Sequence, residues 1–460
     1  MRPSSSAPRI LASAAAVVVS LASVMCVGEE PTGQPTEDAS TGADASSPPK
    51  ADTSTGADTS PSISDCEKRR SDESTGVFVS INGADSETCG TRLQPCQLVN
   101  TGIRRAALLK KANVHIARGT YPESITLLAG ITLDGGWDPV GNDWKPVCGT
   151  DSLSATRFAL AATESRVVVA DFTGDAALRQ LTIESKRAAK PGESVVGLFA
   201  VNAKIVLESV VVTMGAAGDG AVGAKGTAGA VGDTRCAAGN GAPGTDGAPG
   251  EAPLAGTFDA SGFTPTNGAP GRLGSSGANG ACGTNIACNT TCTALSPASV
   301  CSMGCGARPL SGCGGKPGTP GEGGMGGGSS IGIFGWSAKI VLKGGAYSVG
   351  NGGKGGAGGE GGAGGAGGAT TSEQLLCVTC AGAGCATVGN QTLATGAVGG
   401  KGGAGGSGSG GSGGSSHAVY VGGPGATFTS EQNPTFTVGQ AGTGGDGSPA
   451  GSAVAVVAPK

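Results

Sequence analysis

Glycine recurs at every third position over long stretches of the second half of this chain. Of the 90 glycines, 17 lie in residues 1–214 and 73 in residues 215–460. A three-residue period fits a left-handed extended helix with three residues per turn. The chain therefore divides into a conventional first half and a second half that is not an ordinary globule. The periodic stretches are 220–232, 241–250, 268–283 and 312–327, with Gly-Gly-x units over 352–368 and 399–406.

Three structures are compatible with this period. Collagen needs abundant proline at the triplet positions and three chains, and proline is absent from 352–368. Gly-Gly-x tracts could instead pack side by side as a polyglycine II bundle, with backbone hydrogen bonds between tracts. The third alternative is disordered loops. Fixing a glycine costs more conformational entropy than fixing any other residue, which favours disorder over an ordered bundle.

The N-terminus has the layout of a secretory signal. Two arginines lie in residues 1–9, and an apolar run follows from Ile10 to Met25. That run is shorter than a usual membrane span, so we expect residues 1–25 to be a signal peptide and the protein to be exported. The cysteine directly after the run resembles the lipidation site of bacterial lipoproteins. The resemblance implies lipid attachment at Cys26 and anchoring at the outer membrane or cell surface of a bacterial envelope; otherwise the protein is secreted.

Residues 26–76 are rich in Ser, Thr, Pro and Asp and contain almost nothing large and apolar. The pentapeptide S-T-G-A-D occurs at 40–44 and again at 54–58. A segment of this composition has too little apolar surface to fold. We expect a disordered stalk that holds the following domain clear of a membrane.

From residue 77 the chain changes to short β-branched runs bounded by Gly, Asp or Asn. Such runs predict an all-β domain over residues 77–214. One stretch differs, because apolar residues recur at helical spacing over 97–111 and predict an amphipathic helix. The predicted strands are 77–81, 113–117, 124–127, 131–134, 165–169 and 178–183.

The motif R-G-T-Y-P-E at 118–123 is followed by paired strands and by Gly135, Gly136 and Trp137. This arrangement resembles the start of a right-handed parallel β-helix of the pectin-lyase-like superfamily. The resemblance implies a solenoid whose N-terminal helix caps the first coil. In such a solenoid the apolar residues of each rung stack on those of the next.

Internal repeats support stacked rungs. The sequence A-K-I-V-L is identical at 203–207 and 338–342. A fainter third copy occupies 418–439. We therefore expect further rungs at 331–350 and 417–460, the last with a glycine-rich tail. The glycine-rich inserts at 215–330 and 351–416 would leave the solenoid along one edge.

The cysteines favour disulfide bonds in an oxidising compartment. The chain has 15, and setting Cys26 aside leaves an even number. Cys89 and Cys96 would clip a local loop. The spacing of Cys288, Cys292, Cys301 and Cys305, and of Cys377 and Cys380, leaves zinc as an alternative, although we expect no metal. The disulfide candidates are Cys66, Cys89, Cys96, Cys148, Cys236, Cys282, Cys288, Cys292, Cys301, Cys305, Cys313, Cys377, Cys380 and Cys385.

Few residues are suited to catalysis. Only two histidines are present and the formal net charge is −4, so neither a histidine-based triad nor a nucleic-acid partner is expected. No phosphate-binding loop is present and no cofactor is predicted. Asp171 and Asp175, four residues apart, are the best carboxylate pair. Three further acids, Asp134, Asp138 and Asp143, crowd the loop around the first of three tryptophans that could stack on sugar rings, namely Trp137, Trp144 and Trp336.

Three functions from different classes follow. The first is a non-enzymatic cell-surface or matrix lipoprotein, which resembles the glycine-rich envelope lipoproteins of predatory soil bacteria. The second is an adhesin that binds polysaccharide through the flank of the coil. The third is a polysaccharide-degrading enzyme, motivated by the fold resemblance alone. A carboxylate cluster on one face of the coil would distinguish the enzyme from the other two.

Overall fold

The computed structural model describes the chain from Cys66 onwards. Cys26, the signal region and most of the predicted stalk therefore lie outside the described residues. Of residues 374–392 only the backbone is described. The described residues are 66–459 without 141–142, 150, 160–163, 186–188, 282–310, 372–373, 382–383 and 393–395.

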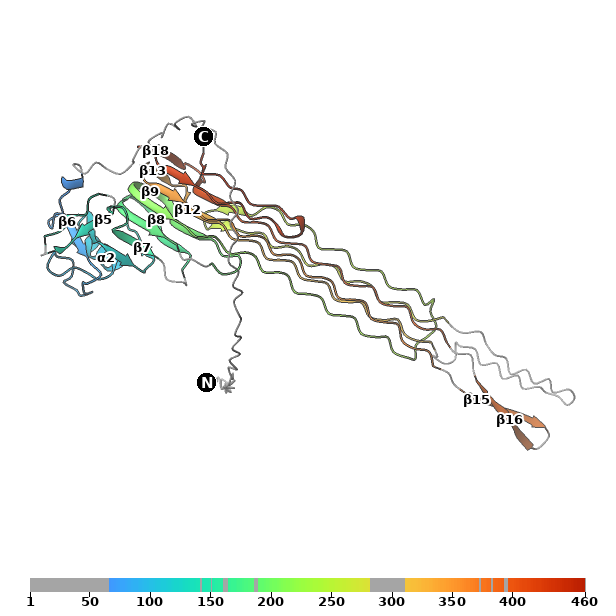
Figure 1. Cartoon of the computed structure of the whole chain (residues 1–460). Helices are drawn as coiled ribbons and strands as arrows, with labels where there is room; N and C mark the ends of the chain where they lie inside the picture. Colours follow the sequence, from blue (N-terminus) through green and yellow to red (C-terminus); the bar gives the residue numbers. More distant parts are fainter. Residues whose placement is uncertain are drawn as a thin grey trace, which may run out of the picture. The chain divides into compact units, whose positions relative to one another are not determined.

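Sixteen strands form one large sheet in which parallel pairs predominate (Figure 1). Parallel neighbours in sequence order are the pattern of a parallel β-helix, which confirms the predicted fold class. The exception is β6 (Lys145–Pro146), which pairs with β5 in antiparallel fashion. The main row is β1 (Gly76–Val79), β2 (Asn113–Ala117), β5 (Thr132–Asp138), β8 (Arg166–Glu184), β9 (Val195–Thr213), β12 (Ser330–Trp336), β17 (Ser416–Gly422) and β20 (Val456–Val457).

The remaining strands build the other faces of the coil or lie outside it. Each long strand bends into several faces at residues with positive φ, such as Asn202 and Ser209 in β9. The strands of these faces are β3 (Gly119–Tyr121), β4 (Ile125–Thr126), β7 (Thr156–Ala159), β13 (Lys339–Lys343), β14 (Ala346–Ser348), β18 (Thr427–Glu431) and β19 (Thr435–Thr437). Two separate hairpins are β10 (Thr257–Asp259) with β11 (Gly262–Thr264), and β15 (Gln374–Ala381) with β16 (Gly384–Thr392).

The sequence repeat is the stacking register of the coil. β9 pairs with β13 so that Lys204 lies beside Lys339 and Leu207 beside Leu342. The same register relates β9 to β12 and to β14. Identical side chains therefore stack on one another along the coil, which confirms the interpretation of the repeat as successive rungs.

The helix α2 (Val99–Leu109) covers the apolar end of the coil, as the resemblance implies. Its buried residues include Val99, Ile103 and Ala106. The carboxylate of Glu123, from the R-G-T-Y-P-E motif, accepts hydrogen bonds from the backbone N–H groups of Val99 (2.7 Å) and Asn100 (3.2 Å). An acidic group at a helix N-terminus satisfies donors that the helix leaves free. The helix is shorter than predicted because Lys110 adopts a left-handed conformation (φ 53°).

The glycine-rich inserts are ordered wherever they are described, so the expectation of disorder is wrong there. Seven tracts within the described residues run side by side without strand geometry (Figure 1). Backbone hydrogen bonds join them at every third residue, for example from the N–H groups of Gly220, Gly223 and Gly226 to carbonyl groups within 354–360. This is the polyglycine II arrangement. We name them tract 1 (215–235), tract 2 (237–256), tract 3 (265–281), tract 4 (311–329), tract 5 (350–371), tract 6 (396–415) and tract 7 (439–446).

Tracts 1 and 5 run parallel to each other, and tract 4 is antiparallel to both. Tract 6 contacts tracts 2, 3, 4, 5 and 7 through backbone hydrogen bonds. A tract with several neighbours needs several bare faces. Tracts 4, 5 and 6 each contact at least four others. Tracts 5 and 6 carry the Gly-Gly-x repeat, and tract 4 has paired glycines at 314–315, 323–324 and 326–327. Tracts 1, 2 and 3, at the borders, carry one glycine per triplet.

Along one row of a tract, meaning every third residue, glycine gives way to residues with side chains where the neighbouring tract ends. In tract 6, the glycines at 400, 403 and 406 face tract 2, and the next residue of that row is Ser409. Its hydroxyl donates to the carbonyl of Glu251 at 2.6 Å, at the end of tract 2. On another row, Lys401, Ala404 and Ser407 change to glycine at 410, where tract 7 packs. Glycine therefore marks backbone contact, residue by residue.

Tracts 1, 5 and 7 begin directly after the third face of successive rungs. The N–H of Met214 donates to Ser348, and that of Val349 donates to Thr437, so the rung register carries over into the tracts. The predicted exit of the inserts along one edge is confirmed. At the opposite end of the bundle, Cys236 is bonded to Cys313 and joins tract 1 to tract 4.

We expect Gly359→Ala to destabilise the protein. A Cβ at 359 would lie closer than 3.0 Å to the carbonyl oxygen of Ala224, a distance that real Cβ atoms essentially never show. Overpacking of this kind costs about 1–3 kcal/mol, whereas glycine-to-alanine changes at unstrained sites stabilise by about 0.4–1 kcal/mol. Chemical denaturation of the purified protein measures the difference.

The matched control is Ala363→Ser, in the exposed row of the same tract. It should leave the denaturation midpoint unchanged. A gain of stability in Gly359→Ala would contradict the close packing of tracts 1 and 5.

Candidate functional site

A buried polar cluster lies where the chain enters the coil. Asp134, at 9% exposure, is its centre. Its carboxylate pairs with Arg69 at 2.6 Å, contacts His115 Nδ1 at 3.2 Å and accepts a hydrogen bond from the Trp137 indole at 3.1 Å. The guanidinium of Arg69 also lies 4.7 Å from the centre of the Trp137 ring.

Electrostatics keep this carboxylate ionised. Burial by itself would raise the pKa of Asp134, but the hydrogen bond from His115 and the charge of Arg69 outweigh it. The pKa is therefore held below its ordinary value. On the other side of the ring, the backbone N–H of Asp72 donates to His115 Nε2 at 3.4 Å, so Nδ1 is assigned the proton that bonds Asp134. Arg69, His115 and Trp137 each form an ion pair or hydrogen bond with Asp134, which indicates a structural role for the cluster.

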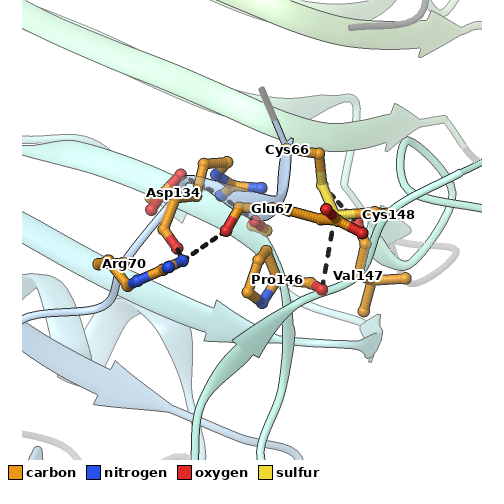
Figure 2. Close-up of a disulfide and its surroundings, with 9 residues drawn as sticks. Cys66, Glu67, Arg70, Asp134, Pro146, Val147 and Cys148 are labelled. Carbon is orange, nitrogen blue, oxygen red and sulfur yellow. Dashed lines mark hydrogen bonds and ion pairs between the residues drawn. A yellow bond between two sulfur atoms is a disulfide. The ribbon is translucent and has the colours of Figure 1, made fainter. Parts of the chain in front are cut away.

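A disulfide between Cys66 and Cys148 fixes the same entry segment (Figure 2). The Cys66 sulfur also lies 3.4 Å from the Val147 carbonyl oxygen, and Arg70 donates to the carbonyl of Glu67. Residues 66–76 are thus part of the coil and not of the stalk, which corrects the predicted boundary at 76. Composition did not predict this, because the Arg69–Asp134 and Cys66–Cys148 bonds that hold the segment join residues 65 and 82 positions apart in the sequence.

An open pocket of about 670 Å³ lies beside this entry point. Its polar side chains include Arg118, Asp138, Asp151 and Arg157. Arg118 pairs with Asp138 at 3.3 Å, and Arg157 pairs with Glu184. The pocket can both donate and accept hydrogen bonds. Sequence reasoning missed it because its residues come from four separate stretches of the chain, in strands as well as loops.

A second surface lies on the outside of the coil, on the face that β9, β12 and β17 form by parallel pairing. Phe199, Phe334 and Tyr420 stack there in register, with ring centres 5.1 and 5.6 Å apart. The β10–β11 hairpin covers the row: Phe258 stacks on Tyr420 at 3.9 Å, and Arg166, over the Phe199 ring, donates to Ser261. The aromatic row could have been found by aligning the three repeats. We name it the aromatic row, residues 199, 334 and 420.

The three tryptophans differ in how far they are exposed to solvent. Trp137 is fully buried and Trp144 is 3% exposed, so neither offers a face to a ligand, and the prediction of ligand contact is wrong for both. Trp144 instead packs edge-on against Phe78. Trp336 is partly exposed beside the aromatic row.

Asp171 and Asp175 are not brought together. Asp171 pairs in register with Val201 and Asp175 with Lys204, and a bend at Gly174 (φ 141°) lies between them. Asp175 forms an exposed ion pair with Lys204 at 2.8 Å. Neither carboxylate lines the pocket. Asp171 does share a row with Trp336, because Val201 pairs with both.

Three disulfides lie within the described residues: Cys66–Cys148, Cys89–Cys96 and Cys236–Cys313. Asp85 lies within reach of Cys89 and Cys96, the three potential metal-binding atoms being within 4.8 Å of one another. Both sulfurs are consumed by the disulfide, so this group lacks thiolate ligands. The zinc alternative falls outside the described side chains, as do Cys282, Cys288, Cys292, Cys301, Cys305, Cys377, Cys380 and Cys385.

Among known proteins, the chain shows only weak structural similarity, and the similar structures are pectin methylesterases. No family model and no curated protein matches the chain. Among solved structures, pectin methylesterase PemA from Erwinia chrysanthemi is 17% identical, with a TM-score of 0.19, covering 30% of this chain and 46% of that one. Pectin methylesterases from carrot (14%, 0.16, 30% and 51%) and Aspergillus niger (14%, 0.17, 33% and 55%) are similar. The chain spans about half the length of these structures.

No helix among the described residues is long and apolar enough to cross a membrane.

The sequence alone did not assign roles to Arg69, His115 or Arg118. Their functions in the coil depend on partners at least 19 residues away.

We expect stability to fall on acidification through His417. This buried ring donates from Nδ1 to the Val454 carbonyl at 3.0 Å and contacts the Ser452 hydroxyl at 3.1 Å, which holds the C-terminal strand. Burial lowers its pKa from the ordinary value of 6.5, partly opposed by the bond to Val454. The unfolded chain therefore takes up the proton first, and stability declines as pH falls below about 6.5.

Denaturation midpoints at pH 7.5 and 5.0 check this. The wild type should lose more stability over that interval than His417→Gln. Asp134 titrates only below its ordinary pKa of 3.8 and does not contribute there. Equal losses in the two proteins would remove His417 as the cause.

Proposed function

We propose that this chain is a non-enzymatic cell-surface or matrix lipoprotein, tethered through Cys26, whose β-helix carries a polyglycine bundle as a spacer. The packing of the bundle supports this most directly. Its tracts contact one another chiefly through backbone hydrogen bonds at their glycines, and side-chain contacts between tracts, such as the Lys225–Glu360 ion pair, involve exposed groups. Neighbouring tracts are therefore held in a fixed register, and the length of the bundle is well defined.

The bundle separates its two ends by a fixed distance. At about 3.1 Å per residue, tract 5 extends about 50 Å from Gly352 to Gly368. Tracts 3 and 4 end beside tract 6, since Ala397 bonds both Ala281 (2.8 Å) and Gly312 (3.1 Å). The described residues that flank the segments 282–310 and 372–395 therefore lie at the same end of the bundle, opposite the coil. A spacer that presents these segments is the simplest use of the architecture.

The cysteines of the two distal segments fit such a presentation. Five lie in 282–310 and three in 374–392. Both numbers are odd, so complete oxidation within the distal end requires at least one bond between the two segments. Together with Cys236–Cys313, such a bond would hold the ends of the tracts together.

We expect Cys26→Ser to move the protein from the membrane fraction to the soluble fraction of a bacterial host. Loss of the cysteine removes the lipid-attachment site that anchors the chain. Immunoblots of fractionated cells, with Cys89→Ser as the matched control, measure the partition. Unchanged membrane association of Cys26→Ser would overturn the lipid anchor and leave the spacer without a tether.

A second candidate function is polysaccharide binding by the coil. The observation that favours it is the row of Asp171, Val201 and Trp336, which joins an exposed carboxylate to a partly exposed indole on one face. Aromatic faces stack on apolar faces of other rings, and carboxylates accept hydrogen bonds. The row offers both within three successive rungs.

For this second function we expect the mature protein to bind an insoluble polysaccharide and Trp336→Ala to reduce the bound fraction about tenfold, equivalent to about 1.4 kcal/mol. Bound protein and released reducing ends are measured in the same tubes. Asp175→Asn, on a different row, is the control and should bind normally. Full binding by Trp336→Ala would exclude the row, and released sugar ends would contradict the non-enzymatic proposal.

A further inference from the structure

The pocket beside the entry point has no assigned occupant. It is lined by the loop after β1 (residues 80–82), by 118–120, by 138–140 with Val147, and by parts of 151–157. At about 670 Å³ it falls within the usual range for binding sites. Neither the polar cluster nor the aromatic row contributes to it.

The polar groups of the pocket are balanced. Arg118 and Arg157 provide donors, and Asp138 and Asp151 provide acceptors, so these four side chains add no net charge. Arg118 and Arg157 remain 61% and 44% exposed despite their ion pairs. A balanced set of donors and acceptors suits the main chain of an extended peptide, which offers N–H and C=O groups in equal numbers.

The lining of the pocket includes exposed apolar side chains. Ile81 is 43% exposed and Val140 is 73% exposed. Pro139, next to Val140 in the sequence, also lines the pocket. An occupant with a single aliphatic side chain would cover them and gain the free energy of burial.

The chain itself delivers a segment to this place. Cys66 is bonded to Cys148, and Val147, the residue before Cys148, lines the pocket. Cys66, to which residue 65 is attached, therefore lies close to the pocket wall. Eight extended residues reach about 26–29 Å, which is more than sufficient to lie across it.

The composition of that segment matches the pocket. Residues 58–65 read D-T-S-P-S-I-S-D, and Ile63 is the sole large aliphatic residue between Gly28 and Asp65. Pro61 favours an extended conformation and reduces the entropy lost on docking. The hydroxyls of Ser62 and Ser64 suit the balanced polar lining.

We propose that the pocket is the docking site for this chain's own residues 58–65, with Ile63 against Ile81 and Val140. The docked segment fixes the point from which the tether leaves the coil and shortens its free part to residues 26–57. The proposal concerns the coil alone and does not depend on the function of the bundle.

The repeated pentapeptide S-T-G-A-D supplies a matched test within one molecule. A protease that cleaves after acidic residues meets the same five residues ending at Asp44 and at Asp58. In the full-length wild type, we expect cleavage after Asp58 to be at least tenfold slower than after Asp44, measured by mass spectrometry over time. Equal rates in the wild type would overturn the proposal.

Two variants establish the cause. Ile63→Ser changes only the docking segment, cannot unfold the coil and adds no acidic cleavage site, and it should raise cleavage after Asp58 to the rate at Asp44. Arg118→Gln combined with Arg157→Gln should do the same from the side of the pocket. Lys204→Gln, on the coil away from the pocket, is the control and should retain protection. Continued protection of Asp58 in Ile63→Ser would show that the pocket is not its cause.

Discussion

Backbone hydrogen bonds between glycine tracts, at a separation that excludes a Cβ atom, are the interaction on which the order of the whole bundle depends. Ordering a residue costs about 1–2 kcal/mol, and glycine costs the most, whereas one hydrogen bond contributes a net 0.5–1.5 kcal/mol or so. Hydrogen bonds alone therefore only roughly offset the cost of order. The bundle must gain the remainder from close backbone packing and from crosslinks such as Cys236–Cys313, which is why a single inserted methyl matters.

The coil supplies what an isolated tract lacks, namely a starting register. Leu198, Ile205 and Leu207 form a conventional apolar core whose neighbours recur in the next copy of the repeat. Because tracts 1 and 5 continue from these rungs, their glycines meet already aligned, from Ala217 with Asn351 onwards. Bringing distant tracts together costs conformational entropy. In the coil, the burial of apolar surface offsets that cost. The coil is thus stabilised by burial of apolar side chains, and the bundle that continues from it by hydrogen bonds between backbones.

The parts of this structure that could be predicted are those encoded by nearby residues or by repeats. The strands, the cap helix and the rung stacking follow from local periodicity and from A-K-I-V-L. The order of the bundle does not, because a Gly-Gly-x tract has the same composition whether or not another tract lies beside it. Its neighbours are distant in sequence, as Lys354 is from Gly220. Asp134 was visible as one acid among several, but Arg69 and His115, which give it a role, come from the entry segment and from β2. Burial likewise separated Trp137 from Trp336, which composition treats alike.

The positions at which side chains return also decide where this protein can act. Glycine occupies a row only where another tract covers it: Ser409 follows where the cover by tract 2 ends, and Ser407 precedes the glycine at 410, where the cover by tract 7 begins. Those side chains occupy the space that a further tract would need. Within the described residues, the borders of the bundle are thus closed to additional glycine tracts, which is a form of protection against edge-to-edge association. Recognition then falls to the places where side chains are varied and accessible, namely the flank and entry point of the coil at one end and the segments beyond the tracts at the other.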